Sequence, residues 1–292
     1  MIKKGWYERD ETLRITRDWT ALNCKNVTER ELDLLRIVYE RKLVRRDHLE
    51  IIVPAYRVLS KNSRVKVLNN SISKLFRMMC LDKMHEKAKI GNGNKPCIVA
   101  IDRAGSILLD VPHKRRIQHD KKILKDGEYI FRALPPNYKH IHGINQLEVD
   151  TILFCEENGY EMKWIHEQHN QYTFFYNQQK ITFIPDVLFG IKINNRVVHS
   201  YIEFDTGKED LRCKTNFPTL TEKLQKYRKF KYSNMWKEKL KRFPILLFVT
   251  EDEKRCKFVE SKMKELGLQG IVCLSGEYRG KVLEYFKELA EG

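Results

Sequence analysis

Apolar residues recur with a helical period between residues 28 and 40. Their spacing of three and four positions predicts one apolar helix face, made by Leu32, Leu35, Val38 and Tyr39. Thr28 stands directly before this segment and Glu31 follows three positions later, which is the pattern of a capping box at a helix start. The pattern therefore predicts a helix that begins after Thr28.

Two further helices and a hairpin are expected in the same part of the chain. A short helix is predicted over residues 46–52, and a longer one over 71–81 with an apolar face made by Ile72, Leu75, Phe76 and Met79. The 16 residues of segment 55–70 are long for the turn between two such helices, and an extra helical turn would fit there. A β-hairpin is expected within residues 84–102, around a Gly-Asn-Gly-Asn turn.

Three helices and a basic hairpin make a winged helix-turn-helix pattern. The polar face of the helix over 71–81 and the flanks of the hairpin turn would then contact bases and phosphates, through Ser71, Ser73, Lys74, Arg77, Lys87, Lys89 and Lys95. A small helical domain that binds another protein has the same pattern. We favour DNA binding because the whole chain is basic.

From residue 142 onward, helices and strands alternate. Helices are predicted over 144–158, where Gly159 ends the helix, over 219–232, over 252–266 and from Arg279 onward. Strands are predicted over 172–176, 181–193, 197–204, 245–249 and 271–274, with a two-residue turn at Asn194. Helix, three strands, helix and strand is the order of the PD-(D/E)XK nuclease core, in which the last strand joins a mixed sheet in parallel. The fold class is therefore α+β or α/β in two domains.

Carboxylates stand where this nuclease core holds a metal ion. Its proline-linked Asp and a Glu on the next strand face a divalent cation, and Pro185-Asp186 and Glu203 match those positions. The usual Lys two residues later is replaced by Asp205, which is expected on the same strand face as Glu203. The site would hold Mg²⁺ through Asp186 and Glu203.

The missing lysine has two candidate replacements on the next predicted helix. Segment 222–242 contains nine Lys or Arg and only two acids, and Lys223 or Lys226 could supply the cation from there.

Glu148 is a further candidate metal ligand, on the apolar side of the helix over 144–158. The alternative is that the helix is rotated so that Glu148 lies at the boundary of the apolar face, and we slightly favour that alternative. For His140, His142, His166 and His169 we favour surface or capping roles over metal binding.

Composition supports an anionic partner. The chain has 55 Lys and Arg against 39 Asp and Glu, a formal net charge of +16, and nucleic acid is the commonest anionic partner of such a protein. We expect double-stranded DNA to be this partner. Segment 112–125 holds six of these cations, among them Arg115 and Arg116, and would follow phosphates. We expect a winged helix domain over 1–112, a basic linker over 113–138 and a nuclease-like domain over 139–292. No membrane-spanning or signal segment is expected, so the location is expected to be cytoplasmic, and scattered cysteines fit a reducing compartment.

Five short motifs resemble the replication-relaxation family of bacterial plasmids and mobile elements. They are AIDRAGSILL (100–109), HIHGINQLEV (140–149), IPDVLFGI (184–191), YIEFDTG (201–207) and TEKLQKY (221–227). The resemblance implies Asp186, Glu203 and Asp205 as acidic positions and Lys223 as the relocated base. Two functions follow: a Mg²⁺-dependent DNA endonuclease or nickase, or a DNA-binding regulator whose inactive nuclease fold serves as a platform for binding or for a homodimer.

Overall fold

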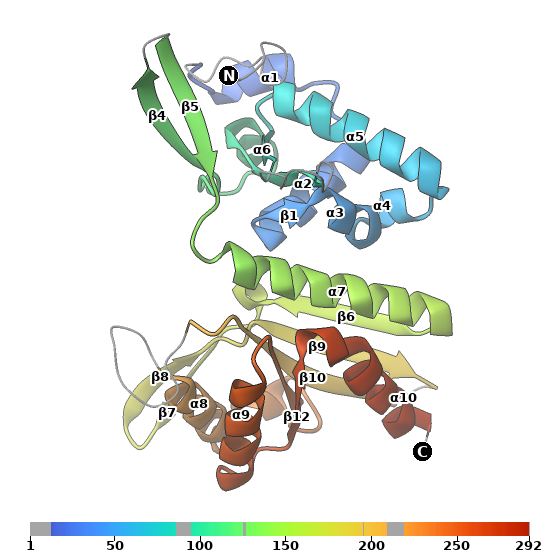
Figure 1. Cartoon of the computed structure of the whole chain (residues 1–292), viewed down its shortest axis with the longest axis vertical. Helices are drawn as coiled ribbons and strands as arrows, with labels where there is room; N and C mark the ends of the chain where they lie inside the picture. Colours follow the sequence, from blue (N-terminus) through green and yellow to red (C-terminus); the bar gives the residue numbers. More distant parts are fainter. Residues whose placement is uncertain (1–12, 86–94, 125–126, 195, 209–218, 292) are drawn as a thin grey trace. The chain divides into compact units, whose positions relative to one another are not determined.

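The computed structural model describes residues 13–85, 95–124, 127–194, 196–208 and 219–291. The chain forms two compact units, residues 1–145 and 146–292. Helix α7 (Tyr138–Asn158) begins in the first unit and ends in the second (Figure 1). No helix in the described part of the chain is long and apolar enough to cross a membrane.

The first unit combines short helices with a small antiparallel sheet. Its helices are α1 (Arg17–Asn23), α2 (Glu29–Arg41), α3 (Arg46–Ile52), α4 (Pro54–Arg57), α5 (Lys61–Arg77) and α6 (Arg103–Leu108). The three strands of the small sheet lie in the order β1 (Val44–Arg45), β3 (Ile98–Ile101) and β2 (Leu81–Met84). The predicted capping box is confirmed, because the Thr28 hydroxyl accepts from the Glu31 N–H and the Glu31 carboxylate accepts from the Thr28 N–H.

Helix α5 begins ten residues earlier than the sequence pattern predicts, at Lys61 instead of residue 71. Its apolar face continues backward from Ile72 to Leu68, which is fully buried, so packing extends the helix through two asparagines of weak helix propensity. Segment 55–70 is therefore no long turn. It contains the last three residues of α4 and the first ten residues of α5.

The segment expected to be a linker forms a second hairpin. Strands β4 (Gln118–Leu124) and β5 (Gly127–Ala133) pair antiparallel, and His119 lies directly opposite Arg132. Both side chains contact the buried carboxylate of Asp82 on β2, His119 Nε2 at 2.6 Å and Arg132 Nε at 3.2 Å. The hairpin is thereby attached to the small sheet.

The second unit is built on a five-stranded mixed sheet. Its strand order is β12 (Gly270–Leu274), β11 (Ile245–Thr250), β10 (Arg196–Asp205), β9 (Val187–Ile193) and β6 (Glu161–His166). Neighbours β6, β9 and β10 run antiparallel, and β10, β11 and β12 run parallel. The prediction of a mixed sheet joined in parallel by the strand after the helix is confirmed.

One predicted strand of this unit is wrong in its bounds, and another is confirmed as a strand but lies outside the main sheet. The predicted strand over 181–193 is split at residues 184–186 into β8 (Gln179–Phe183) and β9, and Pro185 has no N–H to continue a ladder. The strand predicted over 172–176 is confirmed as β7 (Tyr172–Tyr176), which within the described part of the chain pairs with β8 alone, as a separate two-stranded hairpin. The first strand of the main sheet is β6 instead, which the sequence pattern did not predict.

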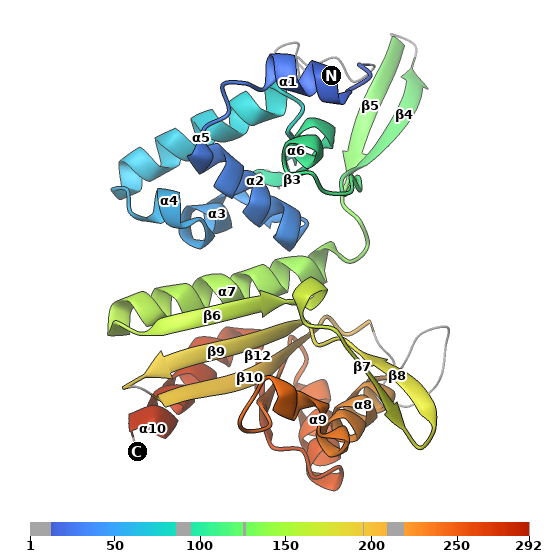
Figure 2. The same ribbon diagram turned by 180° about the vertical axis from the view of Figure 1, so that it is seen from behind.

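Helices cover both faces of the main sheet (Figures 1 and 2). Helices α8 (Leu220–Ser233) and α9 (Glu253–Glu265) pack on the face that carries Tyr201, and their apolar residues form one buried cluster with it. Helix α10 (Glu284–Glu291) packs on the opposite face, where Phe286 contacts Phe189. Short turns complete the unit, at Glu167–His169, Met235–Glu238, Ser275–Glu277 and the π-helical Tyr278–Leu283.

Candidate functional site

Glu203 lies at the centre of the candidate site, near the carboxyl end of β10. Its side chain is on the same strand face as Tyr201, under α8, and the residue is only 1% exposed. The Tyr227 hydroxyl donates a hydrogen bond to Oε1, and the Lys223 ammonium lies 2.5 Å from Oε2. Both partners come from α8, so the helix that follows β10 supplies the polar neighbours of its buried carboxylate.

The pKa of Glu203 is shifted by its surroundings. Burial, followed by the negative charge of Asp186, raises this pKa to about 8, although Lys223 and Tyr227 act in the opposite direction. Burial and the neighbouring Glu203 also raise the pKa of Tyr227 well above its ordinary value, which keeps its hydroxyl a donor. A further positive charge next to Glu203 would therefore stabilise its ionised form.

Asp186 stands directly before β9 and is also buried. Its Oδ2 accepts a hydrogen bond from the backbone N–H of Phe204 at 2.9 Å, which fixes the carboxylate next to the end of β10. Because Phe204 follows Glu203, this bond holds the two predicted metal ligands at neighbouring strand ends. The structure thus brings Asp186, Glu203 and Lys223 together.

A small cavity opens above Glu203. Its volume is about 210 Å³, and it is lined by Glu203, Lys223, Lys226 and Tyr227 together with Thr182, Phe183 and Ile184. Two lysines and one buried carboxyl group in so small a space suit a phosphate group, either directly or through a divalent cation. Lys226, the second candidate for the missing cation, is thus at the same cavity.

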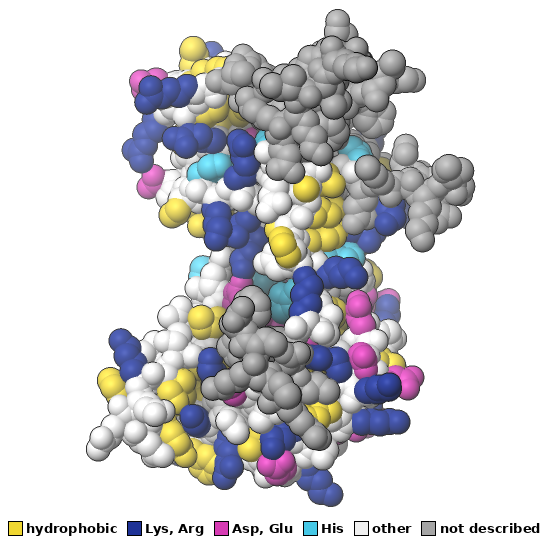
Figure 3. All heavy atoms as spheres, turned by 60° about the vertical axis from the view of Figure 1, so that its left-hand side comes forward, with side chains coloured by type: hydrophobic (Ala, Val, Ile, Leu, Met, Phe, Trp, Pro, Cys, Tyr) yellow, Lys and Arg dark blue, Asp and Glu magenta, His cyan; other side chains and the backbone are white. Residues whose placement is uncertain are grey.

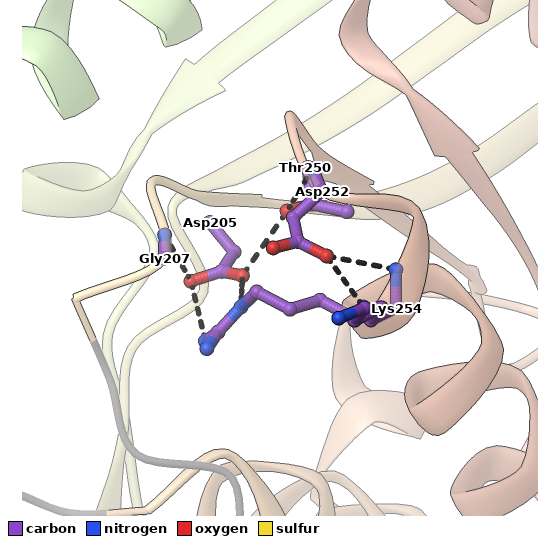
Figure 4. Close-up of polar contacts among 6 residues, drawn as sticks. Asp205, Gly207, Thr250, Asp252 and Lys254 are labelled. Carbon is purple, nitrogen blue, oxygen red and sulfur yellow. Dashed lines mark hydrogen bonds and ion pairs between the residues drawn. The ribbon is translucent and has the colours of Figure 1, made fainter.

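Asp205 is held by a different set of partners (Figure 4). Arg255 on α9 binds both carboxylate oxygens, through Nε to Oδ2 and through Nη2 to Oδ1 at 3.0 Å. The Thr250 hydroxyl donates to Oδ2 at 3.2 Å, and the Gly207 N–H donates to Oδ1 at 3.1 Å. Four hydrogen bonds to one buried carboxylate indicate a structural role for Asp205 and make it a poor candidate for a ligand or catalytic group.

Glu148 does not lie at the boundary of its helix face, and the alternative that we favoured is wrong. It is 2% exposed, and its Oε2 lies 3.4 Å from Nε2 of His166. Of the surface or capping role expected for His166, the surface part is wrong because the residue is buried; it stands at the N-cap position of the Glu167–His169 turn, without a side-chain hydrogen bond to it. His142 stacks between His48 and Tyr138 and is half-buried, as is His140, whereas His169 is exposed.

The donor set fits a cation held by few protein ligands. Among the described residues, no group of three or more His, Cys, Asp or Glu side chains is arranged to hold a metal ion. Asp186 and Glu203 together offer two neighbouring carboxylates, and Mg²⁺ is commonly bound by one or two carboxylates with substrate phosphates and water. Metal binding by Glu148, which pairs with His166, stays a prediction.

The DNA-binding candidates of the first unit differ in exposure. Ser71 is buried and cannot present its hydroxyl on the surface. Lys74 is paired with Glu31 at 2.7 Å, while Ser73 is half-buried and Arg77 exposed. Lys95 and Arg115 are exposed and Arg116 is partly buried, whereas Lys87 and Lys89 lie outside the described residues. Lys and Arg side chains occur on both units in the face drawn in Figure 3.

Two partners in the site escaped the sequence analysis, although each had a signal. Tyr227 lies four residues after Lys223 on α8, and this spacing places both on one helix face. Arg255 is in the first turn of α9, which follows β11, and β11 pairs in parallel with β10 so that Thr250 lies opposite Asp205. Arg255 can be predicted only when the register between β10 and β11 is known, and the sequence pattern does not predict that register.

A comparison with protein families shows the family to which the chain belongs. A family model described as replication-relaxation matches residues 54–246, about two thirds of the chain. The chain belongs to the replication-relaxation family. No curated protein and no solved structure matches it. The matched range includes α5, the whole of β9 and β10, and α8 with Lys223, so it contains every residue around Glu203 described above.

Proposed function

We propose that this replication-relaxation protein binds double-stranded DNA of a plasmid or other mobile element and acts in its replication or relaxation. We further propose that Asp186, Glu203 and Lys223 form a Mg²⁺-dependent endonuclease or nickase site. The observation that carries the proposal is the buried Glu203 beside Asp186, at a cavity whose two cations, Lys223 and Lys226, suit a phosphate.

The order of elements in each unit supports this proposal. From α2 to β3 the order is helix, strand, three helices and two antiparallel strands. Apart from the short α4 between α3 and α5, this is the order of a winged helix, with β1 as the third strand of its sheet. In the second unit, α7, the antiparallel β6, β9 and β10, then α8 and the parallel β11 follow the order of the PD-(D/E)XK core. In that order, Asp186 and Glu203 would be the residues that hold the metal ion.

Each residue of the site has a chemical task in the proposed reaction. Asp186 and Glu203 would hold Mg²⁺, which, when bound, polarises a phosphodiester and lowers the pKa of an attacking water molecule. Lys223 would stabilise the negative charge that develops on the phosphate, and Lys226 would bind a neighbouring phosphate. Asp205 takes no part in the chemistry, because Arg255 already binds both of its oxygens.

A second function has an observation in its favour. Lys223 already lies at Glu203, and the described residues contain no three-donor group for a metal ion. These features suit a regulator that binds DNA without cutting it and uses the second unit as a platform for binding or for a homodimer. Such a regulator keeps the basic surface and the salt-dependent affinity of the nuclease.

Cleavage of plasmid DNA distinguishes the two functions. Supercoiled and linear plasmid are incubated with the purified protein in Mg²⁺, Mn²⁺ or EDTA, and the products are separated on a gel. The nuclease converts supercoiled plasmid to nicked or linear product with the metals, not with EDTA, and Asp186→Ala abolishes conversion while DNA is still bound. Glu161→Ala, at an exposed carboxylate of β6, is the matched control and keeps the activity. Intact DNA with retarded mobility under all conditions refutes the nuclease and supports the regulator.

A further inference from the structure

The β7–β8 hairpin presents one face to solvent beside the candidate site. Residues of β7 alternate, with Tyr172 and Phe174 buried in the cluster under α8 and Thr173 and Phe175 exposed. Thr173 lies directly opposite Thr182, and Phe175 opposite Lys180, so these four side chains share the outer face. Ile184, the next exposed residue after Thr182, extends it. We call Thr173, Phe175, Lys180, Thr182 and Ile184 the hairpin face.

Phe175 is the unusual member of the hairpin face. It is 71% exposed, and it is the one phenylalanine among the described residues with a largely exposed side chain. A single exposed apolar residue is common on protein surfaces and does not by itself indicate a ligand. Here, however, a lysine lies directly across from the ring, and the hairpin face contains no acidic residue. An aromatic ring beside a cation on an exposed strand is the arrangement that stacks nucleic-acid bases.

The hairpin face continues into the candidate site. Thr182, Phe183 and Ile184 line the same cavity as Glu203 and the two lysines of α8. A DNA strand with one phosphate at Lys223 and Lys226 would therefore have its neighbouring nucleotides at Ile184 and Thr182. Farther along β8 it would reach Lys180 and Phe175. The positive charge of Lys180 and of the two α8 lysines is complementary to a phosphate backbone. The ring of Phe175 could stack on a base that is not paired.

We propose that the hairpin face binds unpaired DNA bases next to the phosphate held above Glu203. Phe175 stacks on a base, Lys180 contacts the backbone, and Ile184 packs against the sugar or base nearest the cavity. A base within a duplex is stacked on its neighbours and offers no free face to Phe175, so the inference names single-stranded or locally opened DNA as the substrate of the site. It rests on the proposed function and specifies its substrate class.

Fluorescence anisotropy with labelled oligonucleotides tests the inference. Three probes of one sequence are used: a single strand, a blunt duplex, and a duplex with a single-stranded end. The variants are Phe175→Ala, Phe175→Trp and Lys180→Ala in the full-length protein. Tyr232→Ala is the matched control, because Tyr232 is an aromatic residue of the same unit that is 56% exposed, at the end of α8 and outside the hairpin face. Circular dichroism verifies that each variant is folded.

We expect Phe175→Ala to weaken binding of the single strand and of the duplex with a single-stranded end by about tenfold, the loss of one stacked base. Phe175→Trp restores the affinity, Lys180→Ala weakens it with a reduced salt dependence, and Tyr232→Ala and blunt-duplex binding are unchanged. A probe with 2-aminopurine in the single-stranded end should lose fluorescence on binding to the wild type but not to Phe175→Ala.

Two results overturn the inference and leave the proposed function intact. One is equal single-strand affinity for Phe175→Ala and Tyr232→Ala while Mg²⁺-dependent plasmid cleavage continues. The other is a change of sedimentation coefficient in Phe175→Ala with unchanged DNA affinity, which assigns the hairpin face to contact between copies of the chain. If the wild type binds none of the three probes, both the proposed function and this inference fail.

Discussion

Glu203 and Asp205 are two carboxylates on one face of one strand, and their surroundings differ completely. Glu203 faces α8, where a flexible lysine and a tyrosine contact one oxygen each, and a cavity opens beside it. Asp205 faces the start of α9, where Arg255 binds both oxygens and Thr250 and the backbone complete the set. The first carboxylate is buried but lines a cavity, whereas both oxygens of the second are taken up by hydrogen bonds.

The difference shows that strand position alone does not determine the surroundings of a buried carboxylate. Both residues follow the period of two and both are buried, so the sequence pattern treats them alike. The helix packed against each one decides its role. A planar guanidinium fixes a carboxylate in a bidentate pair, whereas an ammonium is a point charge that can move when a metal ion or a phosphate arrives.

The largest effect is expected from removing the partner of Asp205. Arg255→Met leaves a buried carboxylate without its cation, and we expect the free energy of unfolding to fall by about 3–5 kcal/mol. Urea denaturation followed by circular dichroism measures it. Arg279→Ala, at an exposed pair with Glu157, is the control, with a loss of about 1 kcal/mol or less. Equal losses in the two variants would contradict the structural role of Asp205.

Removing the partner of Glu203 should have a smaller effect. Lys223→Met deletes the cation next to Glu203, but the raised pKa of this residue lets it take up a proton near neutral pH instead of remaining an unpaired charge. We expect a loss of about 1–2 kcal/mol at neutral pH in the same urea experiment, in the range for one lost polar partner. A loss as large as that of Arg255→Met would remove the contrast between the two carboxylates.

Stability should also depend on pH through Glu203. Its pKa is raised in the folded protein from an ordinary 4.5 to about 8, so within this interval the folded state holds a proton that the unfolded state has lost. The contribution of Glu203 to stability is therefore present below the lower value and is lost as pH rises toward the upper one. Urea midpoints across the interval should fall in the wild type and fall less in Glu203→Gln. Parallel curves would argue against the raised pKa.

Lys226 should give the smallest effect. It lines the cavity beside Lys223, and its proposed task is a phosphate contact. Lys226→Ala should weaken DNA binding a few-fold and reduce the slope of log affinity against log salt by about 1. Anisotropy titrations at several salt concentrations measure this slope. Lys262→Ala on α9, whose lysine pairs with Glu265 outside the cavity, is the control and should leave the slope unchanged.

The sequence predicted the elements whose signals are local. The capping box at Thr28, the helix predicted over 219–232 and the turn at Asn194 agree with the structure, because each depends on residues a few positions apart. Strand β6 escaped prediction because EMKWIH is an edge strand with mixed polarity and few β-branched residues. The strand over 172–176, which is β7, was therefore counted in the predicted order as the first strand of the main sheet in place of β6.

The residues of the candidate site could be predicted from the sequence, but the ion pairs that they form could not. The positions of Pro185-Asp186, Glu203 and Lys223 follow from short motifs, and the structure brings the three side chains together. The pair between Asp205 and Arg255 joins residues fifty positions apart, through strand pairing that no local pattern specifies. Likewise, the burial of Glu148 depends on His166, which lies on the unpredicted β6.

The most direct test of the account measures the binding of a divalent metal ion to the protein itself and does not depend on DNA cleavage. Mn²⁺ is titrated by isothermal calorimetry into the wild type and into Asp186→Asn, Glu203→Gln and Asp205→Asn, each verified as folded. The account predicts one site in the wild type, its loss in Asp186→Asn and Glu203→Gln, and its retention in Asp205→Asn. Absence of a Mn²⁺ site in the folded wild type, or its loss in Asp205→Asn alone, would contradict the assignment of Asp186 and Glu203 as the metal-binding carboxylates.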